Sequence, residues 1–436
     1  MSSPRTALVI RGGRVVDPAS GYDATADVLV VDGLVAAIDA RGIAPPAIAE
    51  VFDAEGCIVA PGLVDIHVHF REPGQEHKET LASGGAAALA GGFTTVCCMP
   101  NTKPALDTPT LVEFVRLKGD ALRQCRIHPV AAATIGRAGE ALAPMGAMSA
   151  AGAVAFSDDG DCVASAGMML KVLQTCQSLG RAFMQHCQEP TLTKGGVMNA
   201  GPLATRLGLG GWPRLAEEIV IERDLRLNRD IGAAYHAQHV SSGGSVEIIR
   251  AARRRGEPVT GEVAPHHLLM TEEACAGYDT GAKMNPPLRA ASDIAQLKLG
   301  VADGTITILA TDHAPHAPDE KGLDFNSAPF GIIGVESALP LYREALIDDG
   351  VIGWPRLIAM MTIEPARLVG LDRHGVGHLR VGAPGDITVI DPAAAWTIDA
   401  SQFRSKSRNS PFDGRAVRGQ AIATIVGGEI RFRLRR

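Results

Sequence analysis

The sequence LVDIHVHFR at residues 63–71 is an apolar run that ends in two histidines separated by one residue. Short apolar runs of this kind are typical of strands that are buried on both faces of a parallel sheet. Seven similar runs follow along the chain. The eight candidate strands are residues 63–68, 93–99, 127–133, 153–156, 182–185, 233–240, 259–263 and 306–310.

Helical segments separate many of these runs, at residues 78–90, 110–122, 166–179, 214–227 and 244–255. Eight alternating strand and helix units predict a closed (β/α)8 TIM-type barrel, a fold whose chemistry lies at the carboxyl ends of the strands. A doubly wound open sheet is the competing architecture. It is disfavoured because no GxGxxG motif follows an early strand.

Both ends of the chain have a different texture, with short strands between turn residues. Strands are expected at 7–11, 27–31 and 34–39, and again at 386–390 and 422–426, with Gly427-Gly428 as a hairpin turn. We therefore expect a small β-sandwich domain made of residues 1–61 and 376–436, and a barrel domain at 62–375.

The composition limits the class of protein. Of 436 residues, 42 are Lys or Arg and 48 are Asp or Glu, so no basic excess is available to bind a nucleic-acid backbone. No apolar stretch reaches the roughly 18 residues of a membrane span. The eight cysteines lack CxxC spacing and no secretory start is evident, which favours a soluble cytoplasmic protein with reduced thiols.

Metal-capable residues fall at the carboxyl ends of the candidate strands. His67 and His69 lie two apart, so period-2 alternation points both imidazoles to the same side. The others are the Asp158-Asp159 doublet, His186, His239 and Asp312. A lone HxH is more often structural, but half-buried polar groups at so many strand ends need a common partner, and a divalent metal supplies one. Nitrogen and carboxylate ligands suit Zn²⁺ best, with Mn²⁺ or Co²⁺ as replacements.

Five motifs resemble those of the bacterial type I dihydroorotases of the amidohydrolase superfamily, and the resemblance extends over essentially the whole chain. They are HVHFREPG at 67–74, MPNT at 99–102, FSDDG at 156–160, KMNPPLR at 283–289 and ATDHAPH at 310–316. The resemblance implies a cyclic amidohydrolase. Its reaction would be the reversible closure of N-carbamoyl-L-aspartate to L-dihydroorotate in pyrimidine biosynthesis.

The resemblance also implies a ligand set for two Zn²⁺ ions per subunit. His67, His69 and Asp312 would hold one ion, and His186 and His239 the other. Asp159 and a hydroxide would bridge them, with Asp158 as the alternative bridge. Hydantoinases use a carboxylated lysine at this place, and we find no equivalent lysine near strand four. Asp312 would also act as general base and then general acid.

The substrate carboxylate is assigned by the same resemblance to Arg71, Asn101 and His316, with Asn285, Phe330 and Gly331 nearby. A planar guanidinium and a neutral amide are suitable donors for a carboxylate. The structural alternatives are an ion pair between Arg71 and Glu72, and turn-forming roles for Asn101 and Asn285. His266 and His267 match no ligand position and are interpreted as structural.

Two alternative functions stay open. A hydantoinase-like or allantoinase-like amidohydrolase would share the barrel and most ligands. A non-catalytic subunit that scaffolds aspartate transcarbamoylase would be expected to lose metal ligands.

As partners we expect a small-molecule substrate, a second copy in a homodimer and, as an association known for this family, aspartate transcarbamoylase. Residues 315–331 follow the last strand, are rich in Gly, Pro and charge, and are predicted to form a mobile lid.

Overall fold

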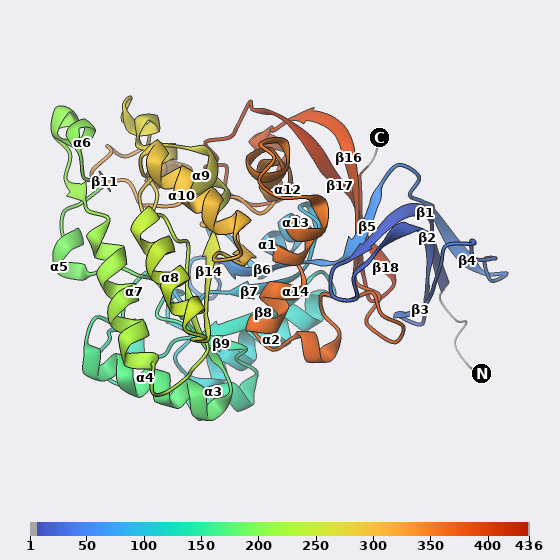
Figure 1. Cartoon of the computed structure of the whole chain (residues 1–436), viewed down its shortest axis with the longest axis horizontal. Helices are drawn as coiled ribbons and strands as arrows, with labels where there is room; N and C mark the ends of the chain where they lie inside the picture. The colour runs from blue at the N-terminus through green and yellow to red at the C-terminus, as the bar shows by residue number, and fades with distance from the viewer. Residues whose placement is uncertain (1–6, 435–436) are drawn as a thin grey trace.

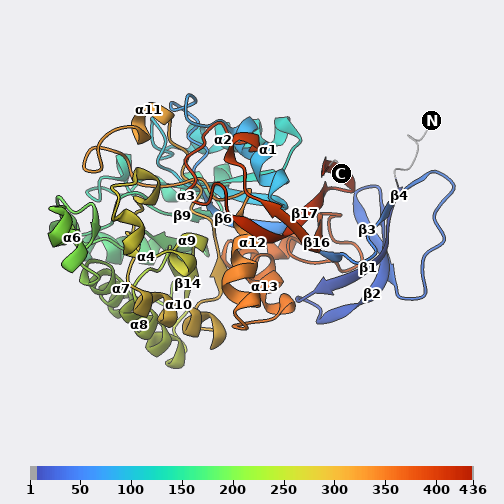
Figure 2. The ribbon, with the colours of Figure 1, turned by 90° about the horizontal axis from the view of Figure 1, so that it is seen from above.

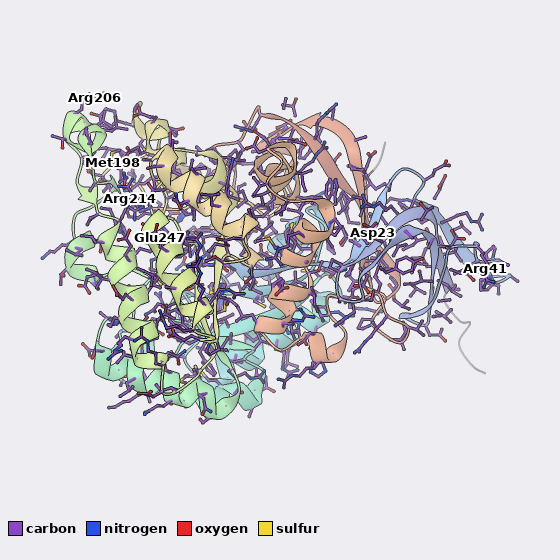
Figure 3. The ribbon with its side chains drawn as sticks, in the orientation of Figure 1. Asp23, Arg41, Met198, Arg206, Arg214 and Glu247 are labelled. Atoms are coloured by element: carbon purple, nitrogen blue, oxygen red, sulfur yellow. The ribbon has the colours of Figure 1, made fainter. Side chains whose placement is uncertain are left out.

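The computed structural model describes residues 7–434, which form a barrel and a β module side by side (Figure 1). The barrel lies to the left in this view and the β module to the right. Figure 3 labels Asp23 and Arg41 on the module and Arg206 at the opposite end of the molecule. Among residues 7–434, no helix is long and apolar enough to cross a membrane.

The barrel contains eight parallel strands that neighbour one another in chain order. They are β6 (Leu63–Val68), β7 (Phe93–Cys98), β8 (Arg126–Ala131), β9 (Ala155–Phe156), β10 (Ala182–Gln185), β13 (Tyr235–Ala237), β14 (Val259–Val263) and β15 (Ile308–Leu309). The first and last strands approach through a bridge between Val68 and His313, where the His69 N–H donates to the His313 carbonyl at 2.9 Å. This contact joins the first strand to the last, so the barrel is nearly closed, in agreement with the barrel predicted from the sequence.

Helices surround the barrel, and several begin at capping side chains that the sequence provides. Thr80, Thr108 and Ser165 each accept a hydrogen bond from a backbone N–H three residues further on. The longer helices are α1 (Leu81–Ala90), α2 (Pro109–Leu122), α4 (Ala166–Leu179), α7 (Leu215–Asn228), α8 (Gly243–Arg254) and α10 (Ala291–Ala302).

Shorter elements fill the connections. They are α3 (Met145–Ala151), α5 (Pro190–Thr193), α6 (Pro202–Leu207), α9 (Pro265–Leu269), α11 (Pro318–Lys321), α12 (Ala338–Tyr342), α13 (Trp354–Met360), α14 (Ile363–Leu368), and the strand pair β11 (Met198–Asn199) and β12 (Gly211–Trp212). Short 3₁₀ turns lie at Ile135–Arg137, Glu272–Cys275, Thr280–Ala282, Asp372–His374 and Ala400–Gln402, and a π-helical turn follows α12 at Arg343–Asp348.

The β module is a single mixed sheet to which both chain ends contribute. Its strands are β1 (Ala7–Asp17), β2 (Tyr22–Val31), β3 (Leu34–Asp39), β4 (Ala49–Asp53), β5 (Ile58–Pro61), β16 (Ile387–Thr397), β17 (Ala416–Val426) and β18 (Glu429–Arg433). Antiparallel pairing of β5 with β16 joins the two ends, with Val59 opposite Val389. Residues from both ends, including Ile10, Val28 and Ile425, share one buried core.

These observations confirm the predicted fold class, while the domain boundaries at 61/62 and 375/376 stay a prediction. The predicted Gly427-Gly428 turn joins β17 to β18, and both glycines have the positive φ that such a turn requires. Among the barrel strands the limits differ most at 233–240, where only Tyr235–Ala237 pairs as strand. In the β module, β1, β16 and β17 are longer than predicted. Beyond Ala237 the chain is no longer a strand, although the Gln238 N–H still donates to the Gln185 carbonyl at 3.1 Å and the Val240 N–H to the Glu262 carbonyl at 2.9 Å. His239, between these two residues, has a left-handed φ of 31°.

An ion pair joins the two parts. Arg126 at the start of β8 donates to both carboxylate oxygens of Asp386, at 2.7 and 3.0 Å, and the Asp386 carbonyl accepts from the Gly62 N–H at 2.9 Å. In Figure 2 the red connection between β16 and β17 extends away from the module and over the barrel. The module therefore contacts the loops at the carboxyl ends of the barrel strands as well as the side of the barrel.

Candidate active site

The six candidate ligands converge at the carboxyl ends of the barrel strands. His67 lies within β6 and His69 just after it, while the other four follow β9, β10, β13 and β15. All are buried, none more than 8% exposed. Two groups of them, His67 with Asp159 and His239, and His67 with His69 and Asp312, bring their donor atoms within 4.8 Å of one another.

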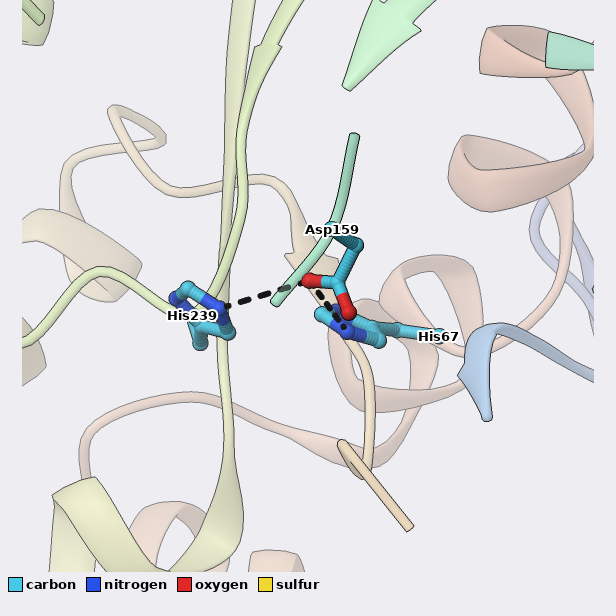
Figure 4. A group of neighbouring side chains, drawn as sticks. All are labelled: His67, Asp159 and His239. Carbon is cyan, nitrogen blue, oxygen red and sulfur yellow. Dashed lines mark ion pairs between the residues drawn. The ribbon is translucent and has the colours of Figure 1, made fainter. Parts of the chain in front are cut away.

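Asp159 stands at the centre of the cluster. Its Oδ1 lies 3.3 Å from His67 Nε2, 3.5 Å from His186 Nδ1 and 3.8 Å from His239 Nε2. Its Oδ2 lies 3.5 Å from His69 Nε2. Figure 4 shows the carboxylate between the imidazoles of His67 and His239, with both ion pairs dashed. One carboxylate thus faces four imidazoles.

Asp312 faces the pair of histidines from β6. Its Oδ1 lies 2.9 Å from His69 Nε2 and 3.5 Å from His67 Nε2. Burial acts to raise the pKa of Asp312, but the charges of His67 and His69 outweigh it and hold this pKa well below its usual range. Burial opposes ionisation of Asp159 in the same way, and the neighbouring imidazoles again lower its pKa. Both carboxylates are therefore ionised at neutral pH and suited to bind a cation.

The neighbouring Asp158 is turned away from this cluster. Its carboxylate accepts hydrogen bonds from the Ala133 and Thr134 N–H groups at 2.9 and 3.0 Å, and from the Thr134 hydroxyl. Of the two candidates for a bridge, the structure directs Asp159 to the other ligands and uses Asp158 to fix the loop after β8.

Hydrogen bonds to the outer ring nitrogens orient three of the four histidines, while His239 Nδ1 has no hydrogen-bond partner among the described residues. His67 Nδ1 lies 2.5 Å from Glu262 Oε1, His69 Nδ1 lies 2.8 Å from Asn101 Oδ1, and His186 Nε2 lies 2.8 Å from Gln188 Oε1. Oxygen acceptors at these positions hold a proton on the outer nitrogen and leave the inner lone pair free, as is usual for metal-binding histidines.

The inner atoms fit a divalent metal. His67 Nε2 and Asp159 Oδ1 are buried and have no hydrogen-bond partner among the described residues. His186 Nδ1 and His239 Nε2 lie only 2.8 Å apart. Leaving such polar atoms without partners costs on the order of 1–3 kcal/mol each. A cation held by imidazole nitrogens and carboxylate oxygens would remove that cost, and this donor set suits zinc.

A cavity of about 260 Å³ opens onto this cluster. All six predicted substrate-binding residues line it. They are Arg71, Asn101, Asn285, His316, Phe330 and Gly331, alongside the ligands His69, Asp159, His186, His239 and Asp312. His67 is fully buried and lies outside this lining. Within the described part of the chain, the lining contains no lysine.

Arg71 is buried in the cavity wall, with a left-handed φ of 60°. Its Nε donates to the Pro315 carbonyl at 3.1 Å, and its Nη2 lies 3.4 Å from His316 Nε2. Glu72, the alternative partner, instead pairs with Lys118 and accepts from the Leu81 N–H at 2.9 Å. Burial lowers the pKa of Arg71 to about 10, so the guanidinium remains charged at neutral pH.

The other residues predicted to bind substrate form hydrogen bonds with the metal-ligand candidates or with their neighbours. Asn101 contacts two ligands, accepting at its Oδ1 from His69 and donating from its Nδ2 to Asp159 Oδ2 at 3.4 Å. Asn285 Nδ2 donates to Gln188 Oε1 at 3.3 Å, close to His186. Burial, with the nearby Arg71 charge, lowers the pKa of His316 to about 3, so this imidazole is neutral and can accept from Arg71.

Sequence reasoning missed the residues that orient the ligands. Glu262 on β14 holds His67, accepts from the His239 N–H at 3.1 Å and contacts His236 at 2.9 Å. Burial acts to raise the pKa of Glu262, but the imidazoles of His67 and His236 lower it to about 2. The sequence offered one signal for Glu262, a charged residue within a strand that is otherwise mostly apolar. His267, interpreted as structural, bonds to the Pro286 carbonyl at 3.0 Å.

Family models match two long segments of the chain. Residues 56–245 match the dihydro-orotase-like model, and residues 280–432 match the amidohydrolase family model. These segments include the six metal-ligand candidates. A (β/α)8 barrel with this strand-end cluster and these two matches is a cyclic amidohydrolase.

Curated relatives show which family of cyclic amidohydrolases the chain belongs to. A dihydroorotase of Trichlorobacter lovleyi is 48% identical over 98% of this chain and 99% of its own length. A dihydroorotase of Pelotomaculum thermopropionicum is 47% identical over 97% of this chain and 98% of its own. The chain belongs to the dihydroorotase family.

Solved structures support the fold. The L-hydantoinase (dihydropyrimidinase) of Arthrobacter aurescens superposes with a TM-score of 0.87 at 27% identity, covering 97% of this chain and 95% of its own. A dihydropyrimidinase of Brevibacillus agri gives 0.81 at 22% identity, with coverage of 98% and 95%. At this identity the second likeness concerns the fold alone.

Proposed function

We propose that the protein catalyses the reversible ring closure of N-carbamoyl-L-aspartate to L-dihydroorotate at the cavity described above. One observation carries the proposal. The cavity joins the buried histidine and aspartate cluster to a charged guanidinium, Arg71, so a cation-binding centre and an anion-binding group share one small space. Dihydroorotate needs both, because it has a ring amide to open and a carboxylate to hold.

We propose that the cluster binds two zinc ions through the two ligand groups that the resemblance implies, a division that the distances support. His67, His69 and Asp312 form one group, His186 and His239 the other, and Asp159 lies within 3.8 Å of both. When bound, the metal supplies Lewis acidity and lowers the pKa of water towards neutrality.

The chain's own residues then orient the substrate. Arg71 presents a planar charged donor to the substrate carboxylate, and the bond from its Nε to the Pro315 carbonyl keeps the guanidinium in place. Asn285 and the backbone of residues 330–331 line the remaining wall. These contacts place the ring amide towards Asp312.

Asp312 moves the proton. In ring opening, water adds to the amide carbonyl carbon, and the Asp312 carboxylate takes the proton that the water loses. The bond between this carbon and the ring nitrogen then breaks, and the same carboxyl returns the proton to that nitrogen. Ring closure runs these steps in reverse. The lowered pKa of Asp312 means that it enters ring opening as the carboxylate, the form that can take a proton.

The alternatives are less well supported. A hydantoinase does not need a buried guanidinium such as Arg71, because hydantoin has no carboxylate. Its bridging lysine also has no counterpart, since none of the described residues that line the cavity is a lysine. A scaffold for aspartate transcarbamoylase needs no intact cluster, whereas all six candidates converge.

A homodimer and an association with aspartate transcarbamoylase stay predictions. Buried thiols such as Cys97, Cys98 and Cys125 support a reducing, cytoplasmic setting.

The test is a substrate comparison on protein of defined metal content. Ring opening of L-dihydroorotate should exceed that of hydantoin and dihydrouracil, because only dihydroorotate offers Arg71 a carboxylate. Faster turnover of hydantoin or dihydrouracil would contradict the proposal, as would turnover of none of the three.

A further inference from the structure

The connection between β16 and β17 brings a short segment of the β module to the barrel mouth. Residues 404–409, called here the mouth segment, lie along the loops that follow β6 and β15. Glu336 accepts from the Arg404 N–H at 2.8 Å, Glu79 accepts from the Ser405 hydroxyl, and Ser407 donates to the Lys78 carbonyl at 3.0 Å. The mouth segment is therefore fixed to the barrel at several points before it reaches the cavity.

Asn409 ends the mouth segment and contacts the cavity wall on both sides. Its Nδ2 donates to the carbonyls of Ala314 and Gly331, at 3.1 and 3.2 Å. Its Oδ1 accepts from the His316 N–H at 3.3 Å, and its own carbonyl accepts from the Ile333 N–H at 3.1 Å. Ala314, His316 and Gly331 all line the cavity.

These hydrogen bonds hold together the two ends of the loop that follows β15. Residues 314–316 leave the barrel after β15 and residues 331–333 return to it, so a single amide spans the start and the end of residues 315–331. Both amide hydrogens and one lone pair of the carbonyl oxygen are used. Among standard side chains only Asn and Gln offer two donors and an acceptor in this shape, and Gln is longer by one methylene. Arg71 contacts the same wall, through Pro315 and His316.

We propose that Asn409 is a positioning residue for substrate binding, which sets the distance between His316 and Gly331 and so the width of the carboxylate end of the cavity. This inference rests on the proposed function, because it concerns how the same cavity holds its anion. Asn409 does not line the cavity. It acts through the backbone of residues that do.

The experiment compares Asn409→Asp and Asn409→Ala with Ser407→Ala, in full-length protein of defined zinc content. Asn409→Asp keeps size and shape but replaces the two donors by an acceptor, so the carbonyls of Ala314 and Gly331 both lose the hydrogen bond from this side chain, and Gly331 keeps only that from Lys321. Ser407→Ala is the matched control, because it removes a hydrogen bond of the mouth segment to a residue outside the cavity. KM and kcat for L-dihydroorotate are measured, together with the midpoint of thermal unfolding.

Both Asn409 variants should raise KM about tenfold or more while kcat stays within about threefold, the pattern expected when uniform binding is lost. Ser407→Ala should leave KM unchanged. An unchanged KM in the folded Asn409 variants would overturn the inference, as would an equal rise in Ser407→Ala. Variants that fail to fold would assign Asn409 a structural role and also overturn it. Inactive wild-type protein would contradict the proposed function itself.

Discussion

The end of the cavity that we propose to bind metal stands on the barrel strands, whereas the wall that we propose to bind the substrate carboxylate is made of loops held by other loops. Asp159 and Asp312 follow strands directly and are oriented by neighbours inside the barrel. Arg71 and His316 lie in connections whose positions depend on Pro315 and on Asn409, far along the chain. The proposed metal ligands are thus held by strands, and the proposed carboxylate-binding residues by contacts between loops.

Local backbone strain occurs at three residues of the cavity lining. Arg71, His239 and Asp312 are not glycines, yet their φ angles are 60°, 31° and 48°. Such conformations cost on the order of 1–3 kcal/mol each and persist where surrounding structure enforces them. The comparison predicts that substitutions at the metal end reduce turnover strongly, and that substitutions in the loop wall weaken substrate binding.

The largest effect is expected for Asp312→Ala. Removing both a ligand candidate and the proton carrier should lower kcat by about a hundredfold or more in both directions, with the fold intact. Steady-state rates and circular dichroism measure this. Asp120→Ala, at an exposed position of α2, is the matched control. Retention of more than about a tenth of the wild-type kcat would contradict the role given to Asp312.

Glu262→Gln tests the support beneath the metal end. The amide keeps the shape but no longer offers a charged acceptor to His67, so metal affinity should fall by roughly 10-fold to 100-fold. Competition with a chelator of known affinity measures this without reference to turnover. Glu247→Gln, on the exposed face of α8, should change nothing. Unaltered metal affinity in Glu262→Gln would limit Glu262 to a packing role.

Arg71→Lys tests the loop wall. The charge remains but the planar pair of donors is lost, so kcat/KM for dihydroorotate should fall at least about tenfold. Metal content should stay at the wild-type level, in contrast to Glu262→Gln. Arg206→Lys, an exposed change on α6, is the control. If kcat/KM is unchanged, Arg71 serves the structure of the wall only.

The smallest effect concerns the motion predicted for residues 315–331. Lys321 Nζ donates to the Pro329 and Gly331 carbonyls at 3.0 and 3.2 Å, so trypsin can reach Lys321 only when this loop opens. Saturating dihydroorotate should slow cleavage there about threefold or more, since a ligand that binds the closed form lowers the open population. Cleavage at the exposed Lys194 should not respond. Equal rates at Lys321 with and without ligand would exclude a lid.

Much of the barrel could be predicted because its strands are short apolar runs between turns. β6, β10 and β14 occupy the predicted ranges without a shift. Strand ends also identified the ligand candidates, since period-2 alternation and the barrel's geometry place them together.

Tertiary contacts settled what the sequence could not. Asp158 and Asp159 are equally buried neighbours, and only the amides of Ala133 and Thr134 decide which carboxylate turns outward. Asn409 belongs to the connection between two module strands, with a sequence separation of 95 to Ala314 and 78 to Gly331, the two ends of the loop that it holds. No local pattern relates such distant residues.

The most direct test of the account is a zinc titration of metal-free protein, following L-dihydroorotate ring opening and bound metal together. The account predicts no turnover without metal, and activity that rises with zinc until about two ions are bound per chain, as expected for a two-metal site. In Asp159→Asn, at the carboxylate between both ligand groups, binding and turnover should fall together. Full turnover of the metal-free protein, or wild-type zinc binding and rates in Asp159→Asn, would contradict it.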